Sequence, residues 1–266
     1  MISFHQVCTL SQSTEEDLRL AHRLGYDAIG LYRRKISDGD LDTIADQVRG
    51  SGLGVTSLSW AGGFTGSDGC TFEDSLEDAR AAVVEASRLG ASVLTLISGG
   101  LNSHIRRHAR RMLCRALGSL APLAERHGVT LGLEPIHPGC GPDWSFIQPL
   151  AAAVDVVREV AHPSVRLVVD LYHVGWCDPP PEMTRQAAEV AGLVQLGDGR
   201  ATPDGEMNRC PLGWGAIPLE RLVGDLRDGG YDGPWEVELV GQDVEQIEYD
   251  ELLKHALGVT RDLLVA

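Results

Sequence analysis

The sequence predicts a (β/α)₈ barrel, the TIM-barrel architecture, in which eight parallel strands close into a barrel inside a ring of helices. Eight short apolar runs, rich in β-branched residues, alternate with eight longer stretches that have the apolar spacing of amphipathic helices. The short runs are apolar on both faces, as buried strands of a parallel sheet must be. The chain has 266 residues, close to the roughly 250 that eight such units occupy. No shift in composition marks a linker, so we expect one domain over residues 1–266.

The eight predicted strands are short runs of mostly Val, Ile, Leu and aromatic residues. They cover residues 4–9, 28–32, 55–60, 92–97, 130–136, 166–173, 193–196 and 235–240. A doubly wound open sheet is the alternative for alternating strands and helices. That fold usually has a glycine-rich nucleotide-binding turn after its first strand, and neither GxGxxG nor GxxxxGK[ST] occurs here. The barrel is therefore favoured.

The predicted helices begin near capping residues, and several end at glycine. Ser13 or Thr14 can cap the first helix, and Gly25 ends it. The third helix stops in the same way at Gly90. The eight helices cover residues 13–24, 40–50, 72–89, 102–127, 146–160, 181–190, 218–228 and 244–264.

Charge and composition exclude several classes of partner. The chain has 38 acidic and 23 basic residues, and its formal net charge of −15 repels nucleic acids and anionic membranes. No apolar run approaches the roughly 20 residues that span a bilayer. The first residues lack the basic and apolar regions of a signal peptide. We expect a cytoplasmic protein that binds a small molecule, with no nucleic acid or membrane partner.

Six cysteines, at positions 8, 70, 114, 140, 177 and 210, include no CxxC pair. Their spacing matches no structural zinc site, so we expect reduced thiols. Cys140 and Cys177 lie in predicted loops and stay open as catalytic residues, although the sequence offers neither a positioned helper.

Three acidic residues end predicted strands among apolar neighbours: Glu134, Asp170 and Glu238. In a barrel, side chains at these strand ends line the reaction pocket. Three carboxylates cannot all ionise in an apolar pocket without a cation, and oxygen ligands favour Mn²⁺ or Mg²⁺. The sequence therefore predicts a divalent metal site. Glu236 shares the sheet face of Glu238 by period two, so the pattern leaves open which of them faces the pocket.

Four segments, in chain order, match a known family. They are residues 133–138 (LEPIHP), 169–173 (VDLYH), 213–218 (GWGAIP) and 230–233 (GYDG), the last followed by Glu238. They resemble the sugar phosphate isomerase/epimerase family, which has the xylose isomerase-like TIM barrel. The resemblance implies a metal held by Glu, Asp, His and Glu from strands five to eight, with both glutamates also acting as acid and base.

For this chain, the resemblance implies Glu134, Asp170 and Glu238 as metal ligands, and Glu134 and Glu238 as the catalytic acid and base. The fourth ligand falls on Gln195, where many relatives have histidine. A glutamine carbonyl can still bind a hard cation, so Gln195 is the expected fourth ligand, although it could instead bind substrate. Mn²⁺ is the expected ion, with Mg²⁺ or Co²⁺ as alternatives.

Four further residues are candidates for binding substrate. His173 resembles the family's substrate-contacting histidine, and Arg200 stands where relatives contact substrate oxygens; either could instead be structural. His137 could orient substrate or brace its own proline-flanked turn. Trp214 stands between two glycines where the family usually has an acidic residue. This difference predicts a more apolar pocket rim and a bulky or aromatic substrate.

Two basic stretches are given a structural interpretation. Residues 33–35 (RRK), at the end of the second strand, could bind a phosphate or carboxylate, but a charge run is more often a solvated face. Residues 106–115 alternate basic and apolar side chains and are expected on the outer face of the fourth helix.

Such a site supports proton transfer next to a carbonyl through an enediolate. We expect a metal-dependent isomerase or epimerase of a keto-sugar or related polyhydroxylated compound. A metal-dependent lyase (dehydratase or deglycosidase) and a non-catalytic binding subunit with a decayed metal site remain open. The apurinic endonuclease branch of the same barrel is disfavoured, because it predicts a histidine-rich zinc cluster and a basic groove. By analogy with the family, the chain could form a homo-oligomer.

Overall fold

Eight parallel strands close into a barrel in the computed structural model, which describes residues 1–37 and 39–265. Each strand pairs with its neighbours in sequence, and the last strand pairs with the first. The strands are β1 (Ile2–His5), β2 (Ala28–Tyr32), β3 (Gly54–Gly62), β4 (Ala91–Ile97), β5 (Thr130–Leu133), β6 (Val165–Asp170), β7 (Ala191–Leu196) and β8 (Trp235–Val237). The predicted (β/α)₈ barrel is confirmed.

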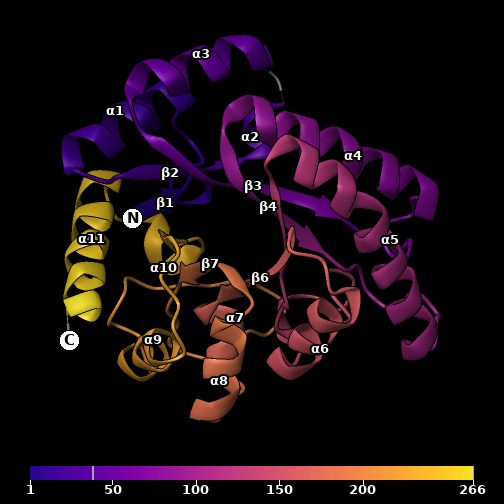
Figure 1. Ribbon diagram of the computed structural model, residues 1–266. Coiled ribbons are helices and arrows are strands. Elements are labelled where there is room, and N and C mark those ends of the chain that lie inside the picture. The colour runs from indigo at the N-terminus through magenta and orange to yellow at the C-terminus, as the bar shows by residue number, and fades with distance from the viewer. Residues whose placement is uncertain (38, 266) are drawn as a thin grey trace.

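Helices surround the strands (Figure 1). The longer ones are α1 (Thr14–Leu24), α3 (Leu41–Ser51), α4 (Phe72–Leu89), α5 (Arg106–His127), α6 (Leu150–Val160), α8 (Pro181–Ala188), α9 (Leu219–Asp228) and α11 (Tyr249–Val265). Short helices occupy several connections: η1 (Gln6–Thr9), α2 (Arg33–Ile36), η2 (Pro138–Cys140), α7 (Leu171–Gly175) and α10 (Gln242–Glu245). Within the described residues, no helix has the length and apolar character needed to span a membrane.

Local signals set the helix ends. Ser13 and Glu16 form a capping box at the start of α1, in which the Glu16 carboxylate accepts the Ser13 N–H at 2.7 Å. Gly25 and Gly90 end α1 and α4 in the left-handed conformation, with φ of 82° and 76°. A residue with a Cβ would be strained there. These ends agree with the expected capping residues.

Four strands end earlier than predicted. The expected strands at 4–9, 130–136, 166–173 and 235–240 end at His5, Leu133, Asp170 and Val237. The residues that follow them continue into η1, α7 or irregular segments, where most of the apolar side chains remain buried. Periodicity cannot separate a strand from such a short buried connection. His173 therefore lies in α7 and not on a strand.

The inward side chains change character along the barrel axis. Val93, Val168 and Leu193 form a small apolar cluster. Gly132 leaves the space for it, since a Cβ there would lie 2.6 Å from the Val168 side chain. Two residues further along the same four strands, in the period-two order of a strand, stand polar residues: Thr95, Glu134, Asp170 and Gln195. The candidate site thus lies on an apolar floor at the C-terminal mouth of the barrel.

Candidate active site

The C-terminal ends of β5 to β8 carry the four predicted metal ligands. Glu134 and Glu238 directly follow their strands, and their backbone N–H groups donate to carbonyls of β4 and β7, each at 2.9 Å. Asp170 and Gln195 are register partners on β6 and β7. Glu134, Asp170 and Gln195 are buried, and the Glu238 side chain is 14% exposed. Rigid strands, not loops, therefore hold these groups.

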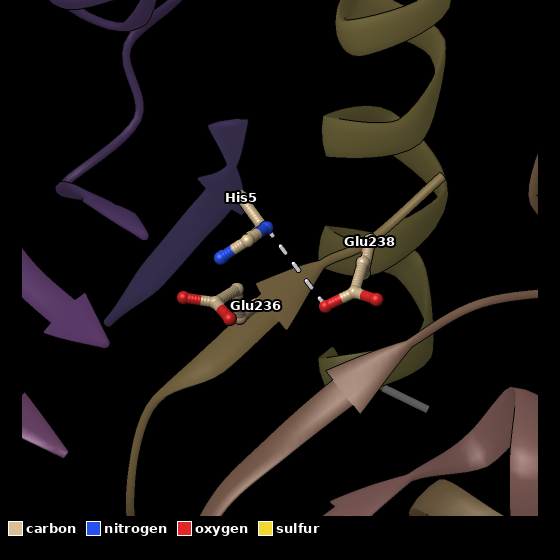
Figure 2. A group of neighbouring side chains, drawn as sticks. All are labelled: His5, Glu236 and Glu238. Atoms are coloured by element: carbon tan, nitrogen blue, oxygen red, sulfur yellow. Dashed lines mark ion pairs between the residues drawn. The ribbon is translucent and has the colours of Figure 1, made fainter. Parts of the chain in front are cut away.

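Glu236 on β8 and Glu238 directly after it both face the barrel interior, which answers the question that the period-two pattern left open. Figure 2 shows both beside His5 of β1, and ligand atoms of the three residues lie within 4.8 Å of one another. Glu238 lies at the cavity, with its Oε2 4.0 Å from Nδ1 of His5. Glu236 comes two residues earlier on the strand and is fully buried. It therefore forms a deeper layer of the site.

The cavity at this mouth has a volume of about 150 Å³. Its polar lining includes Glu134, Gln195 and Glu238. Tyr32 and Trp60 line another part, with stacked rings whose centroids are 5.5 Å apart, and Trp144 lies against Trp60 at 4.9 Å. The expected apolar character of the pocket is therefore present, but these rings supply it and Trp214 does not.

Arg209 is a site residue that sequence reasoning missed. It is fully buried in the long connection after β7. Its Nη2 donates to Asp170 Oδ2 at 2.7 Å and to Glu238 Oε1 at 2.9 Å. Its guanidinium also lies 4.7 Å from the ring centre of Tyr172. Gly197 makes room for it, because a Cβ there would lie 2.6 Å from Nη1 of Arg209.

Burial and mutual repulsion dominate the electrostatics of the site. Burial raises the pKa of Glu134 well above its ordinary value, and Glu238 and Asp170 raise it further. Burial also raises the pKa of Glu238, which Arg209 partly offsets. Burial alone would lower the pKa of Arg209, but the neighbouring carboxylates hold it above its usual value. When ionised, three carboxylates around one guanidinium leave two negative charges, which a divalent cation would balance.

His173 faces two of these carboxylates. Its Nε2 lies 3.5 Å from Asp170 Oδ2 and 3.8 Å from Glu134 Oε1, and its Nδ1 lies 3.6 Å from the Cys140 sulfur. Burial lowers the pKa of His173 to about 4 and raises that of Cys140 to about 12. A protonated thiol can donate to Nδ1, which leaves the hydrogen of the neutral ring on Nε2, facing the carboxylates.

Cys140 is therefore expected to be dispensable for the chemistry. A buried thiol with a raised pKa is a poor nucleophile. The Cys140→Ser variant keeps a donor for Nδ1 of His173, so any turnover should stay within about 3-fold of the wild-type value, and iodoacetamide should not inactivate the native protein. A loss of 100-fold or more in the serine variant would contradict this assignment.

His5 and Ser59 line the cavity but do not form a nucleophilic pair. Ser59 Oγ lies 2.7 Å from Nε2 of His5. Nδ1 of His5 accepts the backbone N–H of Val7 at 3.3 Å, so the ring hydrogen sits on Nε2. The imidazole therefore donates towards Ser59 and the Leu31 carbonyl and cannot take the serine proton. This geometry disfavours a serine hydrolase.

Three of the predicted substrate-binding residues lie outside the cavity lining. Arg200 is half exposed and pairs with Asp243 at 3.4 Å beside a separate cavity of about 220 Å³. Trp214 is 57% exposed and packs edge-on against His255. His137 accepts the Gly139 N–H on Nδ1 at 3.1 Å and so braces its own turn. The sequence does not predict where the side chains of such loop residues point, because chain order does not determine the path of a loop.

Structural ion pairs account for two residues of the basic run 33–35. Arg33 pairs with Asp78 at 2.9 Å and Glu85 at 2.8 Å, both on α4. Lys35 pairs with the buried Asp17 at 2.6 Å. Residues 106–115 form the start of α5 and contribute mostly exposed arginines. The exposed arginines of α5 agree with the expected outer helix face, whereas Arg33 and Lys35 do not form the expected solvated face, because their side chains are only 19% and 9% exposed.

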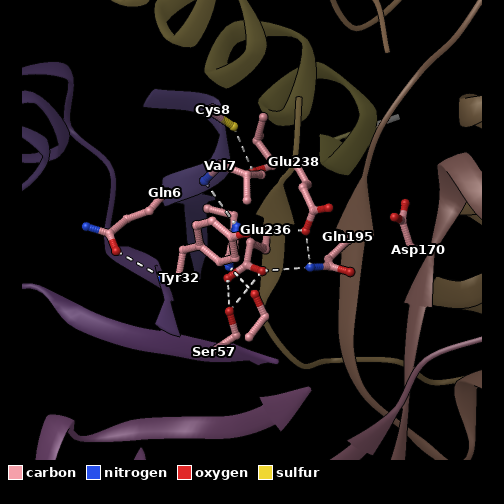
Figure 3. A network of polar contacts seen from close by, with 12 residues as sticks. Gln6, Val7, Cys8, Tyr32, Ser57, Asp170, Gln195, Glu236 and Glu238 are labelled. Atoms are coloured by element: carbon pink, nitrogen blue, oxygen red, sulfur yellow. Dashed lines mark hydrogen bonds and ion pairs between the residues drawn. The ribbon is translucent and has the colours of Figure 1, made fainter. Parts of the chain in front are cut away.

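The donors at the mouth of the barrel fit a hard divalent cation. Nε2 of Gln195 donates to Glu236 Oε1 at 3.0 Å and to Glu238 Oε2 at 2.5 Å. Its Oε1 is buried and accepts no hydrogen bond from the described residues. In Figure 3 this oxygen turns towards Asp170. A buried oxygen without a donor is a suitable ligand for Mn²⁺ or Mg²⁺. Ligand atoms of Glu134, Asp170 and His173 also lie within 4.8 Å of one another, close enough to share one ion.

Comparison with known proteins identifies the family of this chain. Inosose isomerase of Bacillus velezensis is 23% identical over 271 residues, which cover 97% of this chain and 95% of that protein. The structure of IOLI protein with a zinc atom has a TM-score of 0.86 at 21% identity, covering 99% and 97% of the two chains. An L-ribulose 3-epimerase structure has a TM-score of 0.83 at 20% identity, covering 99% and 94%. Residues 18–263 match the family described as xylose isomerase-like TIM barrel, and the chain belongs to that family.

Proposed function

We propose that this protein is a divalent-metal-dependent isomerase or epimerase that moves a proton next to a carbonyl of a keto-sugar or related polyhydroxylated compound. The observation that carries the proposal is the placement of Glu134 and Glu238, which line one small cavity from β5 and β8 together with Gln195. Acid and base catalysis requires groups within reach of the same substrate carbon. The similar proteins include an inosose isomerase and a ribulose epimerase, which supports the same reaction class.

Glu134, Asp170, Gln195 and Glu238 would hold the cation. All four offer oxygen, which favours Mn²⁺ and then Mg²⁺, although zinc is the ion named for the IOLI structure. Bound there, the cation would polarise the substrate carbonyl and a neighbouring hydroxyl, and so acidify the hydrogen on the carbon between them.

The protein's own groups then move the proton. One glutamate accepts it on a carboxylate oxygen, and the other returns a proton to the opposite face or to the adjacent carbon. Arg209 holds Glu238 and Asp170 in place through its two hydrogen bonds. His173 presents Nε2–H from the cavity wall, where it can donate to a substrate oxygen.

The aromatic wall bears on the substrate class. Tyr32, Trp60 and Trp144 give one side of the cavity an apolar surface, opposite in character to the carboxylates. Sugars and cyclic polyols present C–H faces that pack on such rings, while their hydroxyls reach polar groups. The volume of about 150 Å³ suits a small monosaccharide or inosose better than a glycoside.

Hydrogen exchange tests the proposal directly. The protein is freed of metal with a chelator, reloaded with Mn²⁺ and incubated with a panel of keto-sugars and inososes in D₂O. We expect NMR to detect deuterium at a carbon next to the carbonyl only in the Mn²⁺-loaded sample. Bound Mn²⁺ without exchange on any compound would contradict the proposal. Release of a leaving group would instead indicate a lyase, and failure to bind Mn²⁺ would favour a binding protein.

A further inference from the structure

Glu236 is a buried carboxyl group that the proposed proton transfer does not use. It lies on β8 with no exposed surface. Thr56 donates to its Oε2, and the Ser57 hydroxyl lies 2.8 and 3.0 Å from its two oxygens. Nε2 of Gln195 donates to its Oε1 at 3.0 Å (Figure 3). Both oxygens of Glu236 therefore accept hydrogen bonds, from β3 across the barrel and from β7 beside it.

The barrel makes room for this carboxyl group. A Cβ at Gly30 would lie 2.2 Å from Oε2 of Glu236, so only glycine on β2 leaves the space. Ser3 extends the polar layer by contacting the Thr56 hydroxyl at 2.9 Å. Residues of β1, β2, β3 and β7 are thus adapted to one deep carboxyl group on β8. Such a fit indicates a specific role for Glu236.

That role concerns the orientation of the Gln195 amide. An amide presents an oxygen at one end and NH₂ at the other, with nearly the same shape, so only its partners decide which end points where. Glu236 and Glu238 each accept one hydrogen from Nε2 of Gln195. The two acceptors use both hydrogens of the amide, and the buried Oε1 is left for the metal side.

We propose that Glu236 is a positioning residue that locks the amide of Gln195 with its oxygen towards the cavity, and so makes glutamine usable as a metal ligand. The inference rests on the proposed function for the cation that Oε1 would bind, whereas the orientation of the amide does not depend on it. If the amide flipped, NH₂ would face the cation and could not bind it. Glu238 accepts only one of the two amide hydrogens, and Glu236 is the acceptor for the other.

A second cation among His5, Glu236 and Glu238 is the competing explanation for their proximity (Figure 2). Nδ1 of His5 is taken by the Val7 N–H, and its Nε2 faces Ser59 and a carbonyl. Both Glu236 oxygens already accept donors. The neutral His5 ring therefore has no free lone pair for a second ion, and Glu236 already has three hydrogen-bond donors in Thr56, Ser57 and Gln195.

The test combines a metal-free and a metal-bound measurement on the full chain. In the metal-free wild type, ¹⁵N NMR should detect the Gln195 side-chain amide, assigned by its loss in Gln195→Ala, with hydrogens protected from exchange with D₂O. Glu236→Gln keeps the shape of the side chain, but its new NH₂ group can donate to Oε1 of Gln195. The Gln195 amide then loses an acceptor that fixes its orientation, so its hydrogens should no longer be protected from exchange. Ser57→Ala, a milder change, should reduce it if Glu236→Gln does not fold.

Mn²⁺ dissociation constants, measured by EPR, give the second arm. Glu236→Gln should weaken Mn²⁺ binding about 10- to 100-fold, as expected for a residue that orients a ligand. In a Gln195→Ala background, Glu236→Gln should weaken Mn²⁺ binding by less than about 3-fold. An equal loss in both backgrounds, or an amide that remains protected in Glu236→Gln, would overturn the inference. A wild type with a protected amide but no Mn²⁺ binding would refute the proposed function and leave the orienting role of Glu236 intact.

Discussion

Replacing Glu134 or Glu238 by glutamine is expected to lower kcat by about 10²–10⁴-fold, because each variant loses a group that accepts or returns the proton. The glutamine keeps an oxygen at the same place, so Mn²⁺ should still bind, more weakly than to the wild type. Both variants should keep the fold, since the backbone hydrogen bonds of these positions to β4 and β7 do not involve the side chains.

Steady-state kinetics with the substrate found by exchange, together with Mn²⁺ titration, separates loss of chemistry from loss of metal. Glu77→Gln on α4 is the matched control, because Glu77 is mostly exposed and contacts Arg80 on its own helix. Its activity should be unchanged. A Glu134 or Glu238 variant with wild-type kcat at saturating Mn²⁺ would remove that residue from the acid–base pair.

Hydrogen exchange between substrate and D₂O should separate the role of Glu134 from that of Glu238. If the substrate is epimerised, each glutamate serves one face of the carbon. Glu134→Gln should then retain exchange with one epimer, and Glu238→Gln with the other. Loss of exchange with both epimers in both variants would mean that the two carboxylates work together in one proton removal.

The architecture was predictable because the spacing of apolar residues shows which faces of each strand and helix are buried. Each strand is apolar on both faces, as a strand of a parallel sheet must be. Each is followed by an amphipathic helix, and two of these helices end at Gly25 and Gly90, so the strand–helix units can be recognised individually. The strand ends were less predictable. Apolar residues after His5 and Asp170 are buried in short helices, and their side chains give the same sequence pattern as a longer strand.

The site was predictable where a strand carries the residue. Glu134, Asp170, Gln195 and Glu238 stand at strand ends, so their direction follows from period two and the barrel's polarity. Arg209 reaches the same place from a long connection whose path no pattern specifies. Arg200, chosen by chain position, lies outside the cavity lining for the same reason. Gly197 was the available clue, since a glycine directly after a strand marks a close approach by another group.

Removal of the Arg209 guanidinium is expected to have the largest effect on stability. Its hydrogen bond to Asp170 is fully buried, and the Glu238 side chain that accepts the second one is 14% exposed. Arg209→Met keeps much of the apolar stem but leaves these carboxylates without their counter-charge. Breaking a buried ion pair from one side typically costs about 3–5 kcal/mol, and we expect a loss of that size in the metal-free protein. Arg19→Met is the control, because an exposed pair on one helix contributes at most about 1 kcal/mol.

Added Mn²⁺ should restore part of this loss, and that rescue distinguishes an electrostatic role from packing. A cation that binds only the folded state stabilises it by mass action, and it also supplies the positive charge that the variant lacks. Denaturant unfolding with and without Mn²⁺ should therefore show a larger gain for Arg209→Met than for the wild type. Equal gains would mean that Arg209 stabilises the site through its contact with Tyr172 and not through its charge. In either case kcat should fall, because Glu238 loses the hydrogen bond that holds it at the cavity.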